Sequence, residues 1–404
     1  MLKEVLFQNW MPTDGAEETE RSCPEKLFFL SEAFIRKYCA VAGLPAERLE
    51  LVLGKAASFD ADEDIRPLAW HLYRNFCKVK AREFHPFPEF IHPLGYDTGI
   101  LYLLLLLALI PELEARAEKE HFPLRYAHAA ATRIGTFPVY YAQAFPERFG
   151  IRSRSMHFML HFKDSPMFRI GRFDFVLEQA GERSPLVYAR GGEVKIFCCK
   201  GWLLDRDGDR LAPDTAPEKI ARVTRFSDDG AFVCGTEADI RTGLALPGET
   251  RLDAREWKRV AAPGDWVLHF HIPAGGGMSP EICRASFAEA LTFFAAQYPD
   301  QPVKLIFSIS WIFNHAWLDY IPNSNMAALI RSSALFPSAH AANAGLFFVF
   351  GREDADYAGY PRTNSLERAV LDCIADGRPL RAPGAVILPL PGEKQGFSTE
   401  RKPL

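Results

Sequence analysis

The spacing of apolar residues divides this chain of 404 residues into two parts, and the change falls near residue 150. Before that point, apolar residues recur every three or four positions, which is the period of an amphipathic helix. Leu27, Leu30, Phe34 and Tyr38 form one such stripe. This spacing therefore predicts an all-helical domain over residues 25–147.

The longest apolar run, from Ile100 to Ile110, spans 11 residues. A helix that crosses a membrane needs about 20. The run therefore predicts a helix that is buried on all sides inside the helical domain. Pro111 follows at once and marks a kink or the start of another helix.

After residue 150, short runs rich in aromatic and branched residues alternate with Asp-Gly turns. This pattern predicts a predominantly antiparallel sheet. Its strand-like runs are 156–162 ("MHFMLHF"), 167–179, 193–205 and 229–236.

From Asp265 onward the pattern becomes strand, helix, strand, helix, strand, an order that requires helices to cover a sheet. A last helix opens with Asn364 and Glu367 at capping-box spacing. The fold class is therefore α+β, with domains at 1–150 and 151–404. The predicted strands are 266–272, 303–313, 345–351 and 385–390 ("AVILPL"), and the predicted helices are 280–298, 325–336 and 364–377.

Composition narrows the classes of function. Hydrophobic residues make up 48% of the chain and charged residues 24%, which is typical of a globular protein with a sizeable core. The net charge of -4 provides no basic field for nucleic acid or an anionic membrane. The first 23 residues lack the apolar core of a secretory signal, so we expect a cytoplasmic protein.

The cysteines and histidines give no metal-ligand spacing. The eight cysteines contain no C-x-x-C pair, and we expect them to be reduced. His157 and His161 share a face but have no third ligand nearby in the sequence, so we expect no metal.

The loop "IPAGGGMS", from Ile272 to Ser279, lies between a predicted strand and a predicted helix. Ser279 suits the helix N-cap and Pro280 the first turn. Glycine amides beside a helix N-terminus favour an anion, although Glu281 would repel a phosphate held close to it. The loop lacks the P-loop and dinucleotide motifs, so a plain turn stays an alternative.

Taken with its surroundings, the segment 266–350 resembles the acetyl-coenzyme A half of the GNAT acyltransferase superfamily. In that fold a strand ends in a Gly-containing loop that binds the coenzyme pyrophosphate, and the next strand splays away. "NSNMAALIRSSALF" is similar to the family's second helix, with Arg331 in place of the tyrosine that protonates the leaving thiolate. The resemblance implies coenzyme contacts at Ile272, Gly275, Gly276, Gly277, Met278, Ser279, Ser310, Asn323 and Asn325.

A second resemblance covers nearly the whole chain. Bacterial acyltransferase-domain proteins, which join a helical N-acyltransferase-type amino-terminal domain to a GNAT-like carboxy-terminal domain, carry runs similar to "RIGRFDFVLE", "HIPAGGGMSPEICRASF", "SWIF", "IPNSN" and "PRTNSLERAVLD". This resemblance implies a GNAT-like mixed sheet with flanking helices at 151–404. The cosubstrate it implies is acetyl-CoA or another acyl-CoA.

His269 and His271 lie two apart on the strand that enters the glycine loop, so they face one side of the sheet. A histidine can take a proton from an amine near neutral pH. In the GNAT-like reading they are the candidate bases, and Tyr320 is the candidate acid. A pair of structural histidines is the alternative, and surface packing is the alternative for Tyr320.

Other polar residues have two interpretations each. Arg169 and Arg172 flank the glycine of "RIGR" and are either phosphate ligands or solvated strand ends. Ser308 and Ser310 contact pantetheine or satisfy the backbone. Asn323 and Asn325 precede a helix, and capping explains at least one of them.

The resemblance implies transfer of an acyl group from coenzyme A to a small-molecule amine. A GNAT-like protein that binds its ligand without turnover is the alternative, and a homodimer is an open expectation. A serine or cysteine hydrolase has no G-x-S-x-G motif to support it.

Overall fold

The computed structural model describes residues 2–341 and 343–387, and the chain divides into two compact units that are treated separately. The first unit contains residues 1–170 and 273–275, and the second contains 171–272 and 276–404. The division falls after residue 170, whereas the sequence pattern changes near residue 150.

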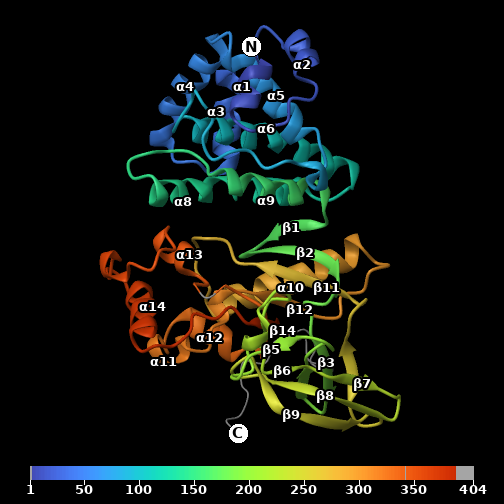
Figure 1. Ribbon diagram of the computed structural model, residues 1–404. Helices are drawn as coiled ribbons and strands as arrows, with labels where there is room; N and C mark the ends of the chain where they lie inside the picture. Colours follow the sequence, from blue (N-terminus) through green and yellow to red (C-terminus); the bar gives the residue numbers. More distant parts are fainter. Residues whose placement is uncertain (1, 342, 388–404) are drawn as a thin grey trace. The chain divides into compact units, whose positions relative to one another are not determined.

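The first unit is helical, as predicted (Figure 1). Its short strand β1 packs on α7 and α9, and Phe168 of β1 meets the ring of Phe122 edge-on at 5.0 Å. The elements are α1 (Leu2–Gln8), α2 (Ala16–Ser22), α3 (Glu32–Ala42), α4 (Leu49–Ala61), α5 (Ile65–Cys77), α6 (Thr98–Lys119), α7 (Leu124–Ala131), α8 (Phe137–Ala144), α9 (Ser153–Asp164) and β1 (Met167–Ile170).

The leucine-rich run forms most of α6, the core helix of the first unit. Residues 98–110 are all buried, and α3, α5, α7 and α9 pack around this helix. By length and composition α6 resembles a membrane span, with a mean hydropathy of 1.8, but 78% of that stretch is buried within the protein. Pro111 lies inside α6, which continues to Lys119 without a break.

The predicted strand at 156–162 is wrong, because this segment belongs to α9. Its buried residues Met156, Met159 and Leu160 recur at spacings of three and one, which suits a helix face and not a strand. His157 and His161 are one helical turn apart, with ring centroids at 5.1 Å.

The second unit is built on a mixed sheet with flanking helices, which confirms the α+β class. Within this unit the strand order is β2, β11, β12, β14, β13. Strand β11 pairs antiparallel with β2 and parallel with β12, and β14 pairs antiparallel with β12 and β13. The strands are β2 (Phe173–Gln179), β11 (Trp266–His271), β12 (Ile306–Ile309), β13 (Ala334–Phe336) and β14 (Gly384–Ile387).

Helix α10 (Pro280–Gln297) covers one face of this sheet. The ring of Phe287 stacks on Phe173 of β2 at 5.0 Å and meets Phe270 of β11 edge-on at 5.2 Å. Alternation along β11 therefore directs Phe270 toward α10 and sends His269 and His271 to the opposite face.

The opposite face packs against a second, antiparallel sheet. Its order is β10, β3, β4, β8, β7, and β9 pairs with β8. Val267, Phe307 and Val386 of the mixed sheet share one apolar core with this second sheet. The strands are β3 (Leu186–Arg190), β4 (Glu193–Phe197), β7 (Phe226–Asp228), β8 (Phe232–Asp239), β9 (Leu244–Asp253) and β10 (Lys258–Ala261), with a small two-stranded sheet of β5 (Leu203–Leu204) and β6 (Arg222–Val223) beside them.

Two predictions in the last third of the chain are wrong. The helix expected at 325–336 ends early, because α12 (Asn325–Arg331) gives way to strand β13. The strand expected at 345–351 is the short helix α13 (Leu346–Phe350), which both flanking glycines enclose with left-handed backbones.

The other predictions for this region fare better. The capping box is confirmed: in α14 (Ser365–Ala375), Glu367 donates its amide to Asn364 Oδ1 at 2.9 Å. The "AVILPL" strand is present as β14 up to Ile387, and residues 388–390 lie outside the described range. Helix α11 (Trp317–Tyr320) completes the unit.

We predict that Gly384→Ala destabilises the second unit. A Cβ at Gly384, in the middle of the mixed sheet, would lie 2.0 Å from the ring of Phe336, which is fully buried. Overpacking of this kind typically costs about 1–3 kcal/mol. The matched control is Gly181→Ala, because a Cβ there meets nothing within 4 Å. Denaturant unfolding that ranks both variants equal would contradict the prediction.

Candidate functional site

The two candidate histidines lie together on the face of β11 that points away from α10. The ring centroids of His269 and His271 are 4.6 Å apart. The ring of Phe307, from β12, stacks on His269 at 4.7 Å with an interplanar angle of 14°. Strand alternation thus places both imidazoles on one face, as the sequence predicted.

His269 is held as a neutral imidazole. Its Nδ1 atom lies 3.6 Å from Glu178 Oε1 of β2, a distance that qualifies as an ion pair only if the ring is protonated. Burial, followed by the nearby His271 and Arg183, lowers the pKa of His269 to about 3. Burial also raises the pKa of Glu178. We therefore interpret the contact as a close polar approach between desolvated groups and not as a salt bridge.

The parallel strands β11 and β12 stop pairing beside these histidines. Their register covers only Leu268 with Ile306 and His269 with Phe307. Along their whole length β11 also pairs with β2 and β12 with β14. Beyond His269 and Phe307 the facing edges of β11 and β12 are therefore not paired with each other.

The glycine loop leads from β11 into α10. Gly275 and Gly276 have φ angles of 75° and 68°, in the left-handed region that favours glycine. The Ser279 hydroxyl accepts a hydrogen bond from Ile282 N at 3.4 Å, which confirms the predicted N-cap, and Pro280 occupies the first turn. The three glycines are exposed, whereas Ile272 and Met278 on either side are half-buried.

Arg172 brings a positive charge to this loop. Its Nε donates to the carbonyl of Gly277 at 3.1 Å, and a Cβ at Gly276 would lie 3.6 Å from the same nitrogen. The backbone N–H of Arg172 donates to Ser286 Oγ on α10 at 3.1 Å. Arg172 is only 9% exposed, so its interpretation as a solvated strand end is wrong.

Glu281, in the first turn of α10, does not exclude an anion from the loop. Its carboxylate is exposed and lies 3.1 Å from Arg284 of the same helix. Hydrogen bonds from its own backbone N–H and from Ser279 lower the pKa of Glu281. Because it is on the surface, this side chain can stay with Arg284 while the glycine amides meet a ligand.

The remaining candidates have structural partners. Ser310 caps the turn 311–313 by accepting a hydrogen bond from Ile312 N at 3.3 Å. Ser324, and not Asn323 or Asn325, caps α12, with Ala327 N at 3.1 Å from its hydroxyl. Capping by either asparagine is therefore wrong, and both are exposed.

Tyr320, the candidate acid, is engaged at the end of α11. Its hydroxyl donates to Asp376 Oδ2 at 2.6 Å, and the guanidinium of Arg378 lies 5.4 Å from its ring centroid. Burial and the hydrogen bond to Asp376 raise the pKa of Tyr320. These contacts keep the proton on the Tyr320 oxygen and direct it toward the Asp376 carboxylate.

Sequence reasoning missed Glu178 and Phe307, the two neighbours that define the environment of His269. Both lie on strands that pair with β11, and strand register cannot be read from one sequence. In "DFVLEQ" the polar residues Asp174 and Glu178 lie on the same face of a strand, and this alternation was the sequence signal for a polar neighbour. No group of three metal-ligand side chains is found among residues 2–341 and 343–387.

We predict that His269 makes the stability of the second unit depend on pH. Its native pKa lies below that of the unfolded chain, so the unfolded state binds more protons as the pH falls from about 6.5 toward 3. The free energy of unfolding should fall by up to about 1.4 kcal/mol per pH unit in this window because of His269 alone. His269→Gln should remove that part of the slope, and His85→Gln, at an exposed site, should not. Equal slopes for wild type and His269→Gln in denaturant titrations would contradict this assignment.

Comparison with known proteins identifies the fold. An acyltransferase solved in complex with decanoyl-CoA and teicoplanin has a TM-score of 0.59 and 17% sequence identity, covering 96% of this chain and 99% of that one. A mutant acyltransferase in complex with octanoyl-CoA gives a TM-score of 0.58 at 16% identity, with the same coverage. At such identities the likeness shows the fold alone.

No curated protein matches the sequence. The sequence model of the GNAT-like C-terminal domain matches residues 167–387, more than half of the 404 residues. This chain therefore belongs to the GNAT-like C-terminal domain family.

Proposed function

We propose that this protein transfers an acyl group from coenzyme A to an amine. The observation that carries the proposal is the end of pairing between β11 and β12, next to a glycine loop that has a buried arginine against it. Strand edges that are not paired with each other suit the two amides of pantetheine, and the loop suits a pyrophosphate. Coenzyme A has both groups in that order.

The pyrophosphate would lie on the amides of Gly276 and Gly277, beside the N-terminus of α10. The partial positive charge of an 18-residue helix favours an anion there, and Arg172 adds a full charge. Since none of the three glycines has a Cβ, the phosphate oxygens can approach the backbone closely. Ser279, the N-cap of α10, extends the same surface.

The thioester would sit where the strands separate, with a backbone amide of β11 polarising its carbonyl oxygen. The amine nitrogen attacks the carbonyl carbon and the carbon–sulfur bond breaks. The attacking nitrogen loses its proton to His271, which is nearer to the glycine loop than His269. We do not assign His269 as the base, because its low pKa makes it a weak base.

The departing thiolate needs a proton. The hydroxyl of Tyr320 already donates a hydrogen bond to Asp376, and Arg331 stands at the position where the family tyrosine is expected. We therefore propose that solvent, and not Tyr320, supplies this proton.

The donor and acceptor are proposed from the structural neighbours. Those acyltransferases were solved with octanoyl-CoA, decanoyl-CoA and teicoplanin, so we propose medium-chain acyl-CoA donors and an amine on a larger molecule as acceptor. Acyl-CoA is an intracellular cosubstrate, which agrees with the cytoplasmic location that we propose.

Ligand binding without turnover is the second candidate function. The engaged hydroxyl of Tyr320 and the arginine at position 331 favour it. Measured release of free coenzyme A in the presence of an amine would rule it out.

We predict that coenzyme A and octanoyl-CoA stabilise the full chain against thermal unfolding, whereas ATP and NADH do not. A ligand at about 100 times its Kd adds about 2.7 kcal/mol when it binds only the native state. Gly276→Asp should abolish the effect, because its carboxylate repels the pyrophosphate. The control is Gly192→Asp, which adds the same charge at another glycine with positive φ and open space around it. Loss of the effect in both variants, or no stabilisation of wild type at millimolar coenzyme, would contradict the proposal.

We predict that His271→Gln lowers kcat by about 10²–10⁴-fold, the usual contribution of a general base. KM for octanoyl-CoA should change little, because His271 acts on the amine. The assay follows thiol release with a panel of primary amines that includes a glycopeptide with a free amine. Tyr320→Phe should leave kcat within about twofold of wild type, since hydrogen-bond loss at an exposed site has a small effect. An equal loss in Tyr320→Phe would instead make Tyr320 the acid.

A further inference from the structure

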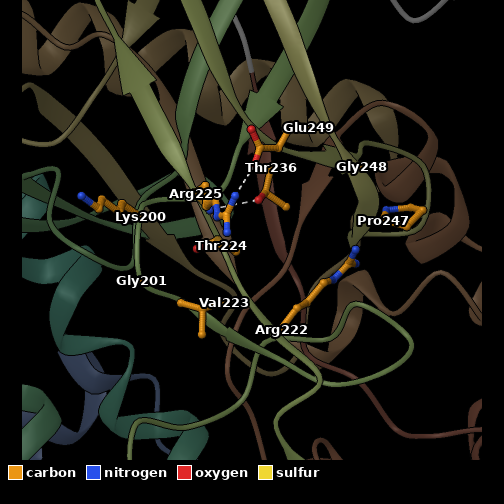
Figure 2. Close-up of a pocket in the computed structure, with 10 residues that line it drawn as sticks. All are labelled: Lys200, Gly201, Arg222, Val223, Thr224, Arg225, Thr236, Pro247, Gly248 and Glu249. Carbon is orange, nitrogen blue, oxygen red and sulfur yellow. Dashed lines mark hydrogen bonds and ion pairs between the residues drawn. The ribbon is translucent and has the colours of Figure 1, made fainter.

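A hollow lies on the antiparallel sheet, and it shares no residue with β11, β12 or the glycine loop. This hollow of about 790 Å³ lies between the segment Arg222–Arg225, Thr236 of β8 and the segment Pro247–Glu249 of β9 (Figure 2). This volume is within the usual range of small-molecule sites, about 300–1,000 Å³. Lys200 and Gly201 complete its rim.

The charge of this hollow is positive. Lys200, Arg222 and Arg225 line it, and Glu249 is the one carboxylate among its lining residues. Glu249 lies 3.4 Å from Arg225 and offsets that charge. Neither Lys200 nor Arg222 has a carboxylate within ion-pair distance in the described part of the chain. Two uncompensated cations therefore border one hollow.

Of these two cations, Arg222 is held by a hydrogen bond. Its Nη2 donates to the carbonyl of Ala245 at 2.6 Å, which fixes the guanidinium against β9. Gly208 permits this contact, because a Cβ there would lie 2.3 Å from the same carbonyl. The Nε of Arg222 is buried and makes no hydrogen bond to any described residue. A buried donor without a partner is costly, and a bound oxyanion would satisfy it after a small side-chain movement.

Two threonines of the wall are held by hydrogen bonds. The hydroxyl of Thr224 donates to Cys199 O at 2.5 Å and accepts from Trp202 N at 2.8 Å, and Thr236 Oγ1 accepts from Arg225 N at 3.1 Å. These hydroxyls bond to backbone groups and so fix the wall of the hollow at Thr224 and Thr236. Lys200 stands at the edge in Figure 2, and its flexible stem lets the ammonium turn over the hollow. Val223, 52% exposed, offers an apolar contact beside the charges.

We propose that this hollow binds an oxyanion, the phosphate or carboxylate group of a small organic molecule, with Arg222 and the more flexible Lys200 as its ligands. Arginine binds either group through paired N–H donors, and the lysine adds a point charge. The site is independent of the coenzyme site and of the proposed reaction.

The test is calorimetric titration of the full chain with inorganic phosphate and, separately, with citrate, at constant ionic strength. We expect saturable binding of at least one of them, with Kd raised about tenfold or more in Arg222→Gln and in Lys200→Gln, as loss of a charged hydrogen bond predicts. Lys200 is exposed, so its variant keeps the test valid if Arg222→Gln fails to fold. The anion that binds tells which oxyanion the site accepts.

Two controls locate the effect. Lys258→Gln removes the same charge from β10, on the other edge of the sheet, and Gly276→Asp blocks the proposed coenzyme loop. Both should bind the anion as wild type does. The proposal is overturned if neither anion binds saturably, if Lys258→Gln weakens binding equally, or if only Gly276→Asp abolishes it.

Discussion

Pairing between β11 and β12 ends at His269 and Phe307, and the chemistry available to the second unit depends on that limit. Two parallel strands that stayed paired would use their backbone N–H and C=O groups in hydrogen bonds to each other. Here each strand stays paired with its other neighbour along its whole length, β11 with β2 and β12 with β14. The parallel pairing therefore ends next to the residues that lead into the glycine loop. Helix α10 packs on one face of the sheet and the antiparallel sheet packs on the other.

The glycine loop and strand β11 differ in charge. At the loop, Arg172 is buried and tied to Gly277 and Ser286, so a positive charge is fixed where the helix N-terminus already favours an anion. Along β11, burial keeps His269 neutral beside Glu178 and Phe307. One charged end and one uncharged end suit the acyl-CoA that we propose, which carries its charge at one end only.

The sequence predicts the broad fold because the two periodicities differ so clearly. Burial of the run from Ile100 to Ile110 and the capping box of Asn364 with Glu367 follow from local patterns. The failures are local too. The segment 156–162 is rich in aromatic residues, yet its buried methionines follow helical spacing, and Ala334–Phe336 becomes a strand only because β14 lies beside it.

Within the candidate site, the sequence predicted the position of the histidines and of the Ser279 cap, since both depend on neighbours in the chain. It did not predict that Arg172 would lie on the glycine loop, 105 positions away, or that Glu178 would face His269. Those relations come from strand register and sheet order. The role of Ser324 as cap, next to two asparagines, shows how a one-residue shift decides which side chains stay free for a ligand.

The most direct measurement is a crystal structure of the full chain with coenzyme A. We expect the pyrophosphate on the amides of Gly276 and Gly277, near Arg172, with pantetheine between β11 and β12 where their pairing ends. A coenzyme bound anywhere else would contradict this expectation.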